Sequence, residues 1–160
     1  MSPQLSSSTA ATFHFGQELV QQAADEIGSK PVIFALAGEL GAGKTHLVKG
    51  IAHELGITDL ITSPSYTLVN EYEFTWNGEP LLFAHIDAWR LESITHLEGI
   101  GWASFLQRNA VIALEWSPEK AMIPLHLSAH VIPVKLEYGQ EENHRLITVG
   151  TERTHTEGQA

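Results

Sequence analysis

Eight consecutive residues at positions 38–45, Gly-Glu-Leu-Gly-Ala-Gly-Lys-Thr, match the pattern G-x-x-x-x-G-K-[ST] without a mismatch. In this pattern, glycines let backbone N–H groups turn inward around an anion, and the following helix directs the partially positive end of its dipole at the same point. The Lys44 ammonium reaches the β- and γ-phosphate oxygens, and the Thr45 hydroxyl is a ligand for Mg²⁺. The residues therefore predict a site for nucleotide phosphates and magnesium.

Two acidic residues stand where such a site needs carboxylates. Asp87 follows the apolar run LLFAHI, and Glu115 follows VIAL. The carboxyl ends of strands in such sheets face the ligand crevice, so both acids are expected near Lys44. We interpret Asp87 as the Walker B acid near Mg²⁺, and Glu115 as a residue that holds Mg²⁺ through water or orients the attacking water. Helix capping by Asp87 and a surface ion pair of Glu115 stay open as alternatives.

A hydroxyl-rich segment, Thr-Ser-Pro-Ser-Tyr-Thr at positions 62–67, lies between the phosphate loop and the next predicted strand. Its hydroxyl groups could contact Mg²⁺ or the γ-phosphate, as a switch loop does, or the segment could be an ordinary turn. Trp116 directly follows Glu115, which favours a position near the nucleotide.

The elements that position these residues alternate between strand and helix. Residues 32–37 form a continuous apolar run, which is typical of a strand buried on both faces, and residues 44–55 follow a helical pattern. Asn77-Gly78 is a strong hairpin signal. The other expected elements are a helix that Ser8, Thr9 or Thr12 caps and that ends near residue 27, helices over 91–98 and 102–107, and strands over 66–74, 81–86, 111–114, 131–138 and 145–149. This order predicts an α/β fold, a P-loop NTPase-like three-layer sandwich with a largely parallel central sheet and some antiparallel strands at the edge.

Composition limits the function further. The chain has 160 residues, no cysteine, and 19 acidic against 9 basic residues, for a formal charge of −10. The lack of cysteine excludes a disulfide framework and a thiol nucleophile, and the negative charge argues against autonomous binding of DNA or RNA. No apolar run approaches the ~20 residues of a membrane helix, and no signal-peptide pattern is present, so we expect a cytoplasmic protein. We expect one P-loop ATPase domain over 9–150, a disordered tail over 1–8 and a flexible tail over 151–160.

The sequence contains four blocks in a characteristic order and spacing: GELGAGKT at 38–45, SPSYTLVNEY at 63–72, HIDAWRL at 85–91 and LEW at 114–116. Together they resemble the TsaE family of small bacterial P-loop ATPases. The first block occurs in many families, whereas the set of four in a chain this short is specific. The resemblance covers about residues 12–119, and extends more loosely to 149.

The resemblance implies roles for individual residues. Lys44, Asp87 and Glu115 are expected to be catalytic, and Thr45, Asp87 and Glu115 to bind Mg²⁺. Three positions depart from the family pattern without removing a phosphate or metal ligand: Ser65 replaces a threonine, Trp89 a tyrosine and His46 a second threonine. The residues expected to contact ATP are Thr9, Gly38, Gly41, Ala42, Gly43, Lys44, Thr45, His46, Ser65, Trp116 and Arg145.

The resemblance also implies a role. The family binds ATP and hydrolyses it slowly, together with the partner proteins TsaB and TsaD, which transfer a threonylcarbamoyl group onto an adenosine next to the anticodon of certain tRNAs. tRNA is therefore expected to be bound only through the complex, with no role for DNA or a membrane.

Two other functions stay open. A small-molecule P-loop kinase would share the loop, Mg²⁺ and Asp87, but such kinases clamp the transferred group with several arginines, and the four arginines here are scattered. A nucleotide-gated binding module would use ATP to order the hydroxyl-rich segment without needing turnover.

Overall fold

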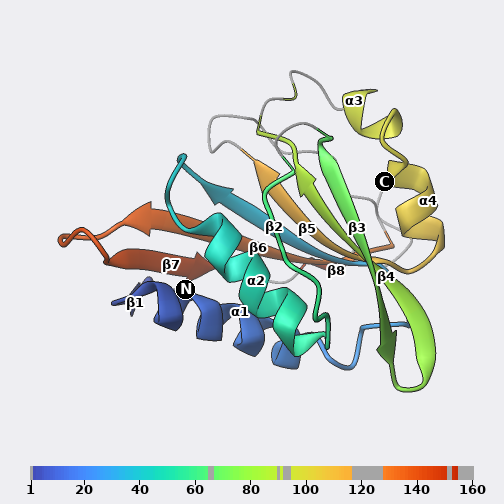
Figure 1. Ribbon diagram of the computed structural model, residues 1–160, viewed down its shortest axis with the longest axis horizontal. Helices are drawn as coiled ribbons and strands as arrows, with labels where there is room; N and C mark the ends of the chain where they lie inside the picture. The colour runs from blue at the N-terminus through green and yellow to red at the C-terminus, as the bar shows by residue number, and fades with distance from the viewer. Residues whose placement is uncertain are drawn as a thin grey trace.

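The computed structural model describes residues 2–64, 67–89, 91, 95–116, 128–150 and 153–154. Its centre is one eight-stranded sheet in the order β1-β7-β6-β2-β5-β4-β3, with β8 paired to β6 (Figure 1). The four central strands β6, β2, β5 and β4 run parallel, and β1, β3, β7 and β8 pair antiparallel. The strands are β1 (Gln4–Ser6), β2 (Val32–Gly38), β3 (Val69–Trp76), β4 (Glu79–Asp87), β5 (Val111–Trp116), β6 (His130–Tyr138), β7 (Arg145–Val149) and β8 (Arg153–Thr154).

Helices cover both faces of this sheet, so the domain has three layers and the predicted fold class is confirmed. Alternate residues of β2 enter two separate cores: Phe34 packs on the side of α1 and α2, and Ile33 on the side of α3 and α4. Continuous burial of both faces explains why the β2 sequence is apolar throughout. The helices are α1 (Thr9–Gln22), α2 (Lys44–Glu54), α3 (Thr95–Glu98) and α4 (Trp102–Gln107).

Helices α1 and α2 lie side by side and approach each other unusually closely (Figure 1). A Cβ atom added to Gly50 would lie 1.9 Å from the carbonyl oxygen of Phe13, and one added to Gly16 would lie 2.2 Å from that of Leu47. Only glycine leaves room for these backbone contacts. The crossing fixes the position of α2, whose first residue is Lys44.

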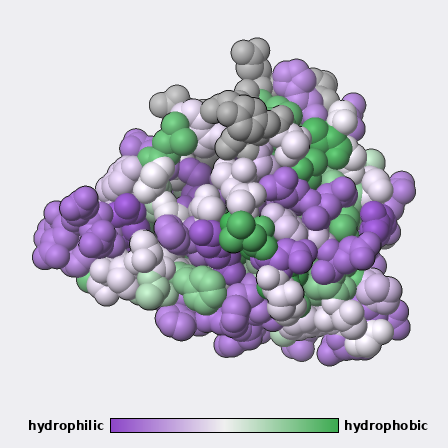
Figure 2. Space-filling model, viewed as in Figure 1, coloured by the Kyte–Doolittle hydropathy of each residue, from purple (hydrophilic) through white to green (hydrophobic). Residues whose placement is uncertain are grey.

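Local signals predicted several boundaries correctly. Asn77 and Gly78 have φ values of 49° and 81° and join β3 to β4, as expected for a two-residue hairpin turn. The expected antiparallel pair at the end of the chain is β6 and β7. On the face that Figure 2 shows, hydrophilic residues gather at the free end of this hairpin, residues 139–144.

Other predictions of local structure were wrong. The first helix ends at Gln22 rather than near residue 27, because residues 23–26 fold into turns and Ile27 forms a bridge with Lys30. Residues 4–6 are not part of a disordered tail: they form β1, whose backbone hydrogen bonds pair it with β7. Arg153 and Thr154 likewise pair with β6, so the expected flexible tail is wrong at these two residues.

The remaining differences lie close to the site. Strand β3 begins at Val69 rather than 66; residues 65 and 66 lie outside the described residues. Of the helix expected over 91–98, Leu91 is not helical, 92–94 lie outside the described residues, and α3 contains four residues. No helix in the described part of the chain is both long and apolar enough to cross a membrane.

Candidate functional site

The phosphate loop occupies the turn between β2 and α2, which confirms the strand–loop–helix context that its motif requires. Gly43, the residue before α2, has φ 100°, and Gly41 has φ 79°. Both values lie in the left-handed region, where a side chain would strain the backbone. The loop thus adopts the conformation for which its glycines are needed.

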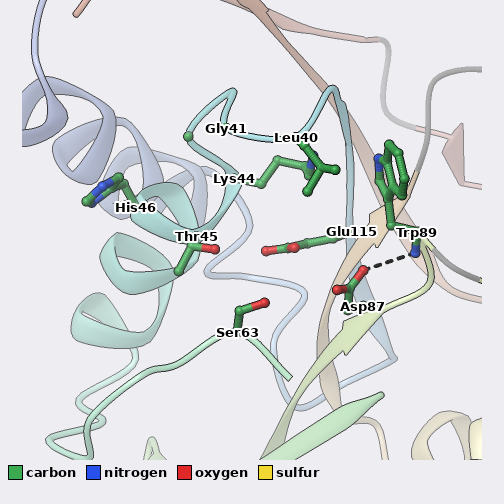
Figure 3. Close-up of a pocket in the computed structure, with 10 residues that line it drawn as sticks. Leu40, Gly41, Lys44, Thr45, His46, Ser63, Asp87, Trp89 and Glu115 are labelled. Carbon is green, nitrogen blue, oxygen red and sulfur yellow. Dashed lines mark hydrogen bonds between the residues drawn. The ribbon is translucent and has the colours of Figure 1, made fainter. Parts of the chain in front are cut away.

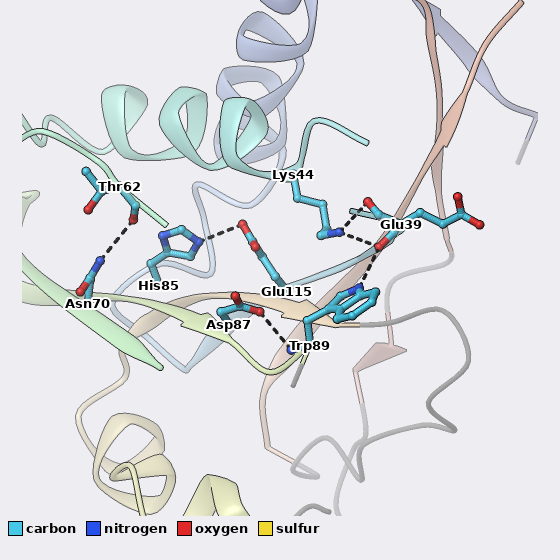
Figure 4. A network of polar contacts seen from close by, with 9 residues as sticks. Glu39, Lys44, Thr62, Asn70, His85, Asp87, Trp89 and Glu115 are labelled. Carbon is cyan, nitrogen blue, oxygen red and sulfur yellow. Dashed lines mark hydrogen bonds and ion pairs between the residues drawn. The ribbon is translucent and has the colours of Figure 1, made fainter. Parts of the chain in front are cut away.

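Lys44 is almost completely buried beside this loop. Its Nζ atom donates hydrogen bonds to the carbonyl oxygen of Gly38 and, at 3.0 Å, to that of Glu39 (Figure 4). Burial lowers the pKa of Lys44 below its ordinary value, while the nearby Glu115 and Asp87 carboxylates oppose this shift. The ammonium is held at the loop by carbonyl groups that an anion could replace.

The two predicted acids lie next to each other. Asp87 and Glu115 are paired in register at the ends of the parallel strands β4 and β5, so their side chains emerge on the same face of the sheet. The Asp87 carboxylate accepts a hydrogen bond from the backbone N–H of Trp89 at 3.0 Å. Asp87 therefore caps the turn that follows β4 and also lines the pocket, and its role as the Walker B acid near Mg²⁺ stays a prediction.

Glu115 has a partner that sequence reasoning missed. Its side chain is only 6% exposed, and Oε1 lies 2.9 Å from Nε2 of His85, which is fully buried (Figure 4). His85 is in register with Ala113, whose small side chain leaves room for this diagonal contact across the sheet. The available signal was the two-residue spacing of His85 and Asp87, which puts both side chains on one face of β4.

The phosphate loop and the two acids surround one pocket, shown in Figure 3. Side chains from β4, β5 and α2 point into the same hollow, as the motif and the strand-end acids predict. Leu40 and Trp89 also line it, although neither was among the predicted site residues. Ser63, which lines it too, belongs to the hydroxyl-rich segment 62–67, for which a switch loop is one of two interpretations. The predicted site residues that line the pocket are Gly41, Gly43, Lys44, Thr45, His46, Asp87 and Glu115.

The other predicted contacts lie elsewhere. Gly38 and Ala42 are buried. The Gly38 carbonyl accepts hydrogen bonds from Lys44 and Trp89, and the Ala42 carbonyl accepts one from Arg145. Thr9 is exposed at the start of α1, where Ser8 supplies the cap. Ser65 and the side chain of Trp116 lie outside the described residues. Direct contacts of these residues with a nucleotide stay predictions.

The donor set suits magnesium. The Thr45 hydroxyl and the carboxylates of Asp87 and Glu115 supply oxygen donor atoms around one pocket. Within the described residues, no group of three or more His, Asp or Glu side chains could hold a metal by itself. Mg²⁺ commonly uses one or two carboxylates together with substrate phosphates, so this arrangement fits it.

The model of one protein family, described as "Threonylcarbamoyl adenosine biosynthesis protein TsaE", matches residues 6–147. A tRNA threonylcarbamoyladenosine biosynthesis protein TsaE from Borreliella burgdorferi is 41% identical over 85 residues, or 52% of this chain and 58% of that protein. The TsaE of a Nostoc species is 39% identical over 112 residues, or 68% of this chain and 64% of that protein. The chain therefore spans less than two thirds of these two relatives.

A solved structure, that of Bacillus subtilis YdiB, is similar over most of the domain. Its TM-score is 0.58 at 25% sequence identity, and the match covers 92% of this chain and 82% of that one. This similarity supports the fold class of the domain.

Proposed function

The chain belongs to the TsaE family, and from that premise we propose that it binds ATP with Mg²⁺ and hydrolyses it slowly. ATP hydrolysis would support the formation of threonylcarbamoyladenosine in tRNA. It would take place in the cytoplasm, together with TsaB and TsaD. The observation that supports the proposal most strongly is the pocket where Lys44 and Thr45 of the phosphate loop meet Asp87 and Glu115.

In this proposal, the loop N–H groups and Lys44 bind the phosphates. Water attacks the γ-phosphorus, a P–O bond to the water oxygen forms, the bond to the β–γ bridging oxygen breaks, and ADP leaves. Glu115, held by His85, orients the water or an ion-bound water, and Thr45 and Asp87 would complete the ligand set for Mg²⁺. Bound Mg²⁺ supplies charge neutralisation at the phosphate oxygens.

The charges at the pocket support a role for partner proteins. Among the described residues that line it, Lys44 is the only lysine or arginine. P-loop enzymes gain large rate factors from an arginine that stabilises the transition state, so we expect slow turnover by the chain alone. A partner protein could supply the missing cation. The formal charge of −10 also favours tRNA contact through the complex.

The test is Mg²⁺-dependent ATP hydrolysis by the purified protein, first alone and then with TsaB, TsaD and tRNA from the same organism. We expect slow turnover alone, acceleration by the partners, and loss of at least about a hundredfold in Lys44→Ala. Turnover that needs a small metabolite and phosphorylates it would favour a kinase instead. Normal tRNA modification by a variant without turnover would favour a nucleotide-gated module.

A further inference from the structure

The phosphate loop has a second set of contacts, outside the pocket. Tyr138 donates from its hydroxyl to the carbonyl oxygen of Leu40. Arg145 donates from Nε to the carbonyl of Ala42 at 3.1 Å and from Nη2 to that of Gly41 at 3.2 Å. Three consecutive loop carbonyls therefore accept hydrogen bonds from two side chains of the β6–β7 hairpin.

Sheet order explains how these side chains reach the loop. Strand β6 runs parallel to β2, with Leu136 opposite Gly38, where β2 ends. Because β6 continues for two more residues, Tyr138 stands beside the loop. Tyr138 is in turn paired with Arg145, the first residue of β7, and the guanidinium carbon lies 4.8 Å from the centre of the tyrosine ring. This is within the range of a cation–π contact.

The same guanidinium is also anchored from the hairpin side. Nη1 of Arg145 donates to the carbonyls of Glu142 at 2.7 Å and His144 at 2.8 Å. One planar fork therefore bridges the hairpin turn and the phosphate loop, which a lysine with its single ammonium group could not reproduce. The turn is exposed and hydrophilic, so burial of apolar surface does not account for this connection (Figure 2).

The contacts set the direction of the loop N–H groups. Within one peptide unit, the C=O and N–H groups point in opposite directions. Carbonyls of Leu40 and Ala42 that point to the hairpin therefore direct the N–H groups of Gly41 and Gly43 away from it, and these two glycines line the pocket. We propose that Tyr138 and Arg145 are positioning residues that brace the phosphate loop from outside and aim these N–H groups before an anion binds. In this role Arg145 acts through the loop, and its expected direct contact with ATP stays a prediction.

The first test needs no nucleotide. Backbone ¹⁵N relaxation of the nucleotide-free protein should give order parameters for Gly41 and Gly43 near the value of rigid backbone, about 0.85. In Arg145→Lys they should fall, toward about 0.6 or below. Tyr138→Phe should lower the value for Gly41 more than that for Gly43. Matched controls are Arg108→Lys on the far side of the sheet and Tyr72→Phe on β3, which should change neither value.

The second test measures affinity for ADP with Mg²⁺ by calorimetry, and this arm rests on the proposed function. Tyr138→Phe removes one neutral hydrogen bond, so we expect affinity about fivefold lower. Arg145→Lys removes a guanidinium group that donates hydrogen bonds to four carbonyls, so we expect affinity for ADP to fall by at least about tenfold. Both controls should bind as the wild type does.

The two tests separate failure of the brace from failure of the function. If the wild type does not bind ADP, the proposed function fails, while the order parameters still decide whether the brace exists. If order parameters and affinity stay unchanged in folded Arg145→Lys and Tyr138→Phe, the brace is wrong. If Arg145→Lys does not fold, the conservative Tyr138→Phe variant decides alone.

Discussion

The two halves of the site are held by different kinds of contact. In the phosphate-loop half, helix α2 is fixed by backbone shape, through the close crossing of α1 and α2 at Gly16 and Gly50, and the loop itself is contacted from outside by Tyr138 and Arg145. The carboxylate half is fixed by polar side-chain contacts, of which the buried bond between His85 and Glu115 is the clearest. Added volume at the helix crossing should therefore disrupt the first half, whereas the second half should respond most to loss of a single donor or charge.

The largest effect is expected from one methyl group in the phosphate-loop half. In Gly50→Ala, the new Cβ would overlap the Phe13 carbonyl oxygen, a backbone atom that cannot move aside cheaply. Overpacking destabilises a protein by about 1–3 kcal/mol. We expect Gly50→Ala to lower the free energy of unfolding, measured in urea, by the upper end of this range or more. The control is Gly99→Ala, where the nearest atom lies 3.5 Å away and we expect a change below about 1 kcal/mol. Equal losses in both variants would contradict the steric account.

The next largest effect should come from removing one charge in the carboxylate half. Glu115→Gln keeps the shape of the side chain but not its charge, so we expect ATP turnover to fall by about a hundredfold. Affinity for ADP should change by less than about threefold, because the loop that binds phosphate is untouched. The measurement is steady-state hydrolysis together with calorimetry, with Glu18→Gln on the exposed side of α1 as the control. A large loss of ADP affinity with normal turnover would contradict the assignment of Glu115 to hydrolysis.

A smaller effect is expected from the residue behind Glu115. His85→Leu removes the hydrogen-bond partner of the carboxylate, and we expect turnover about tenfold lower, with a higher Mg²⁺ requirement. The KM for ATP should change little, since His85 does not line the pocket. His85→Gln retains a donor and should recover part of the activity. If both variants behave alike in kcat and Mg²⁺ dependence, the hydrogen bond has no role in positioning Glu115.

The smallest effect concerns pH. Burial lowers the pKa of Lys44, so its charge is lost as pH rises through a value below 10.5, earlier than for an exposed lysine. Affinity for ADP should therefore fall toward alkaline pH, by at most about tenfold per unit because one proton is involved. Arginine stays protonated throughout this range, so Lys44→Arg should show no such fall. A matching decline in the variant would place the titrating group elsewhere.

Residues close in sequence were predicted well. The phosphate loop could be located because glycine freedom, the lysine and the helix start all lie within eight residues at 38–45. The Asn77-Gly78 turn was likewise a matter of local backbone preference, which its two positive φ values confirm. Local signals failed at the chain ends, because β1 exists only through its pairing with β7, a strand about 140 residues later in the sequence.

The phosphate loop and the two acids at strand ends could be identified from the sequence, since these depend on φ preferences and apolar runs a few residues long. The position of β5 between β2 and β4, which brings Glu115 beside Asp87 and within reach of His85, is a property of the folded chain. The same is true of the path of β6 past the end of β2, which carries Tyr138 and Arg145 to the loop. Sheet order and register depend on how the whole chain packs into the two hydrophobic cores, and no short segment contains that information.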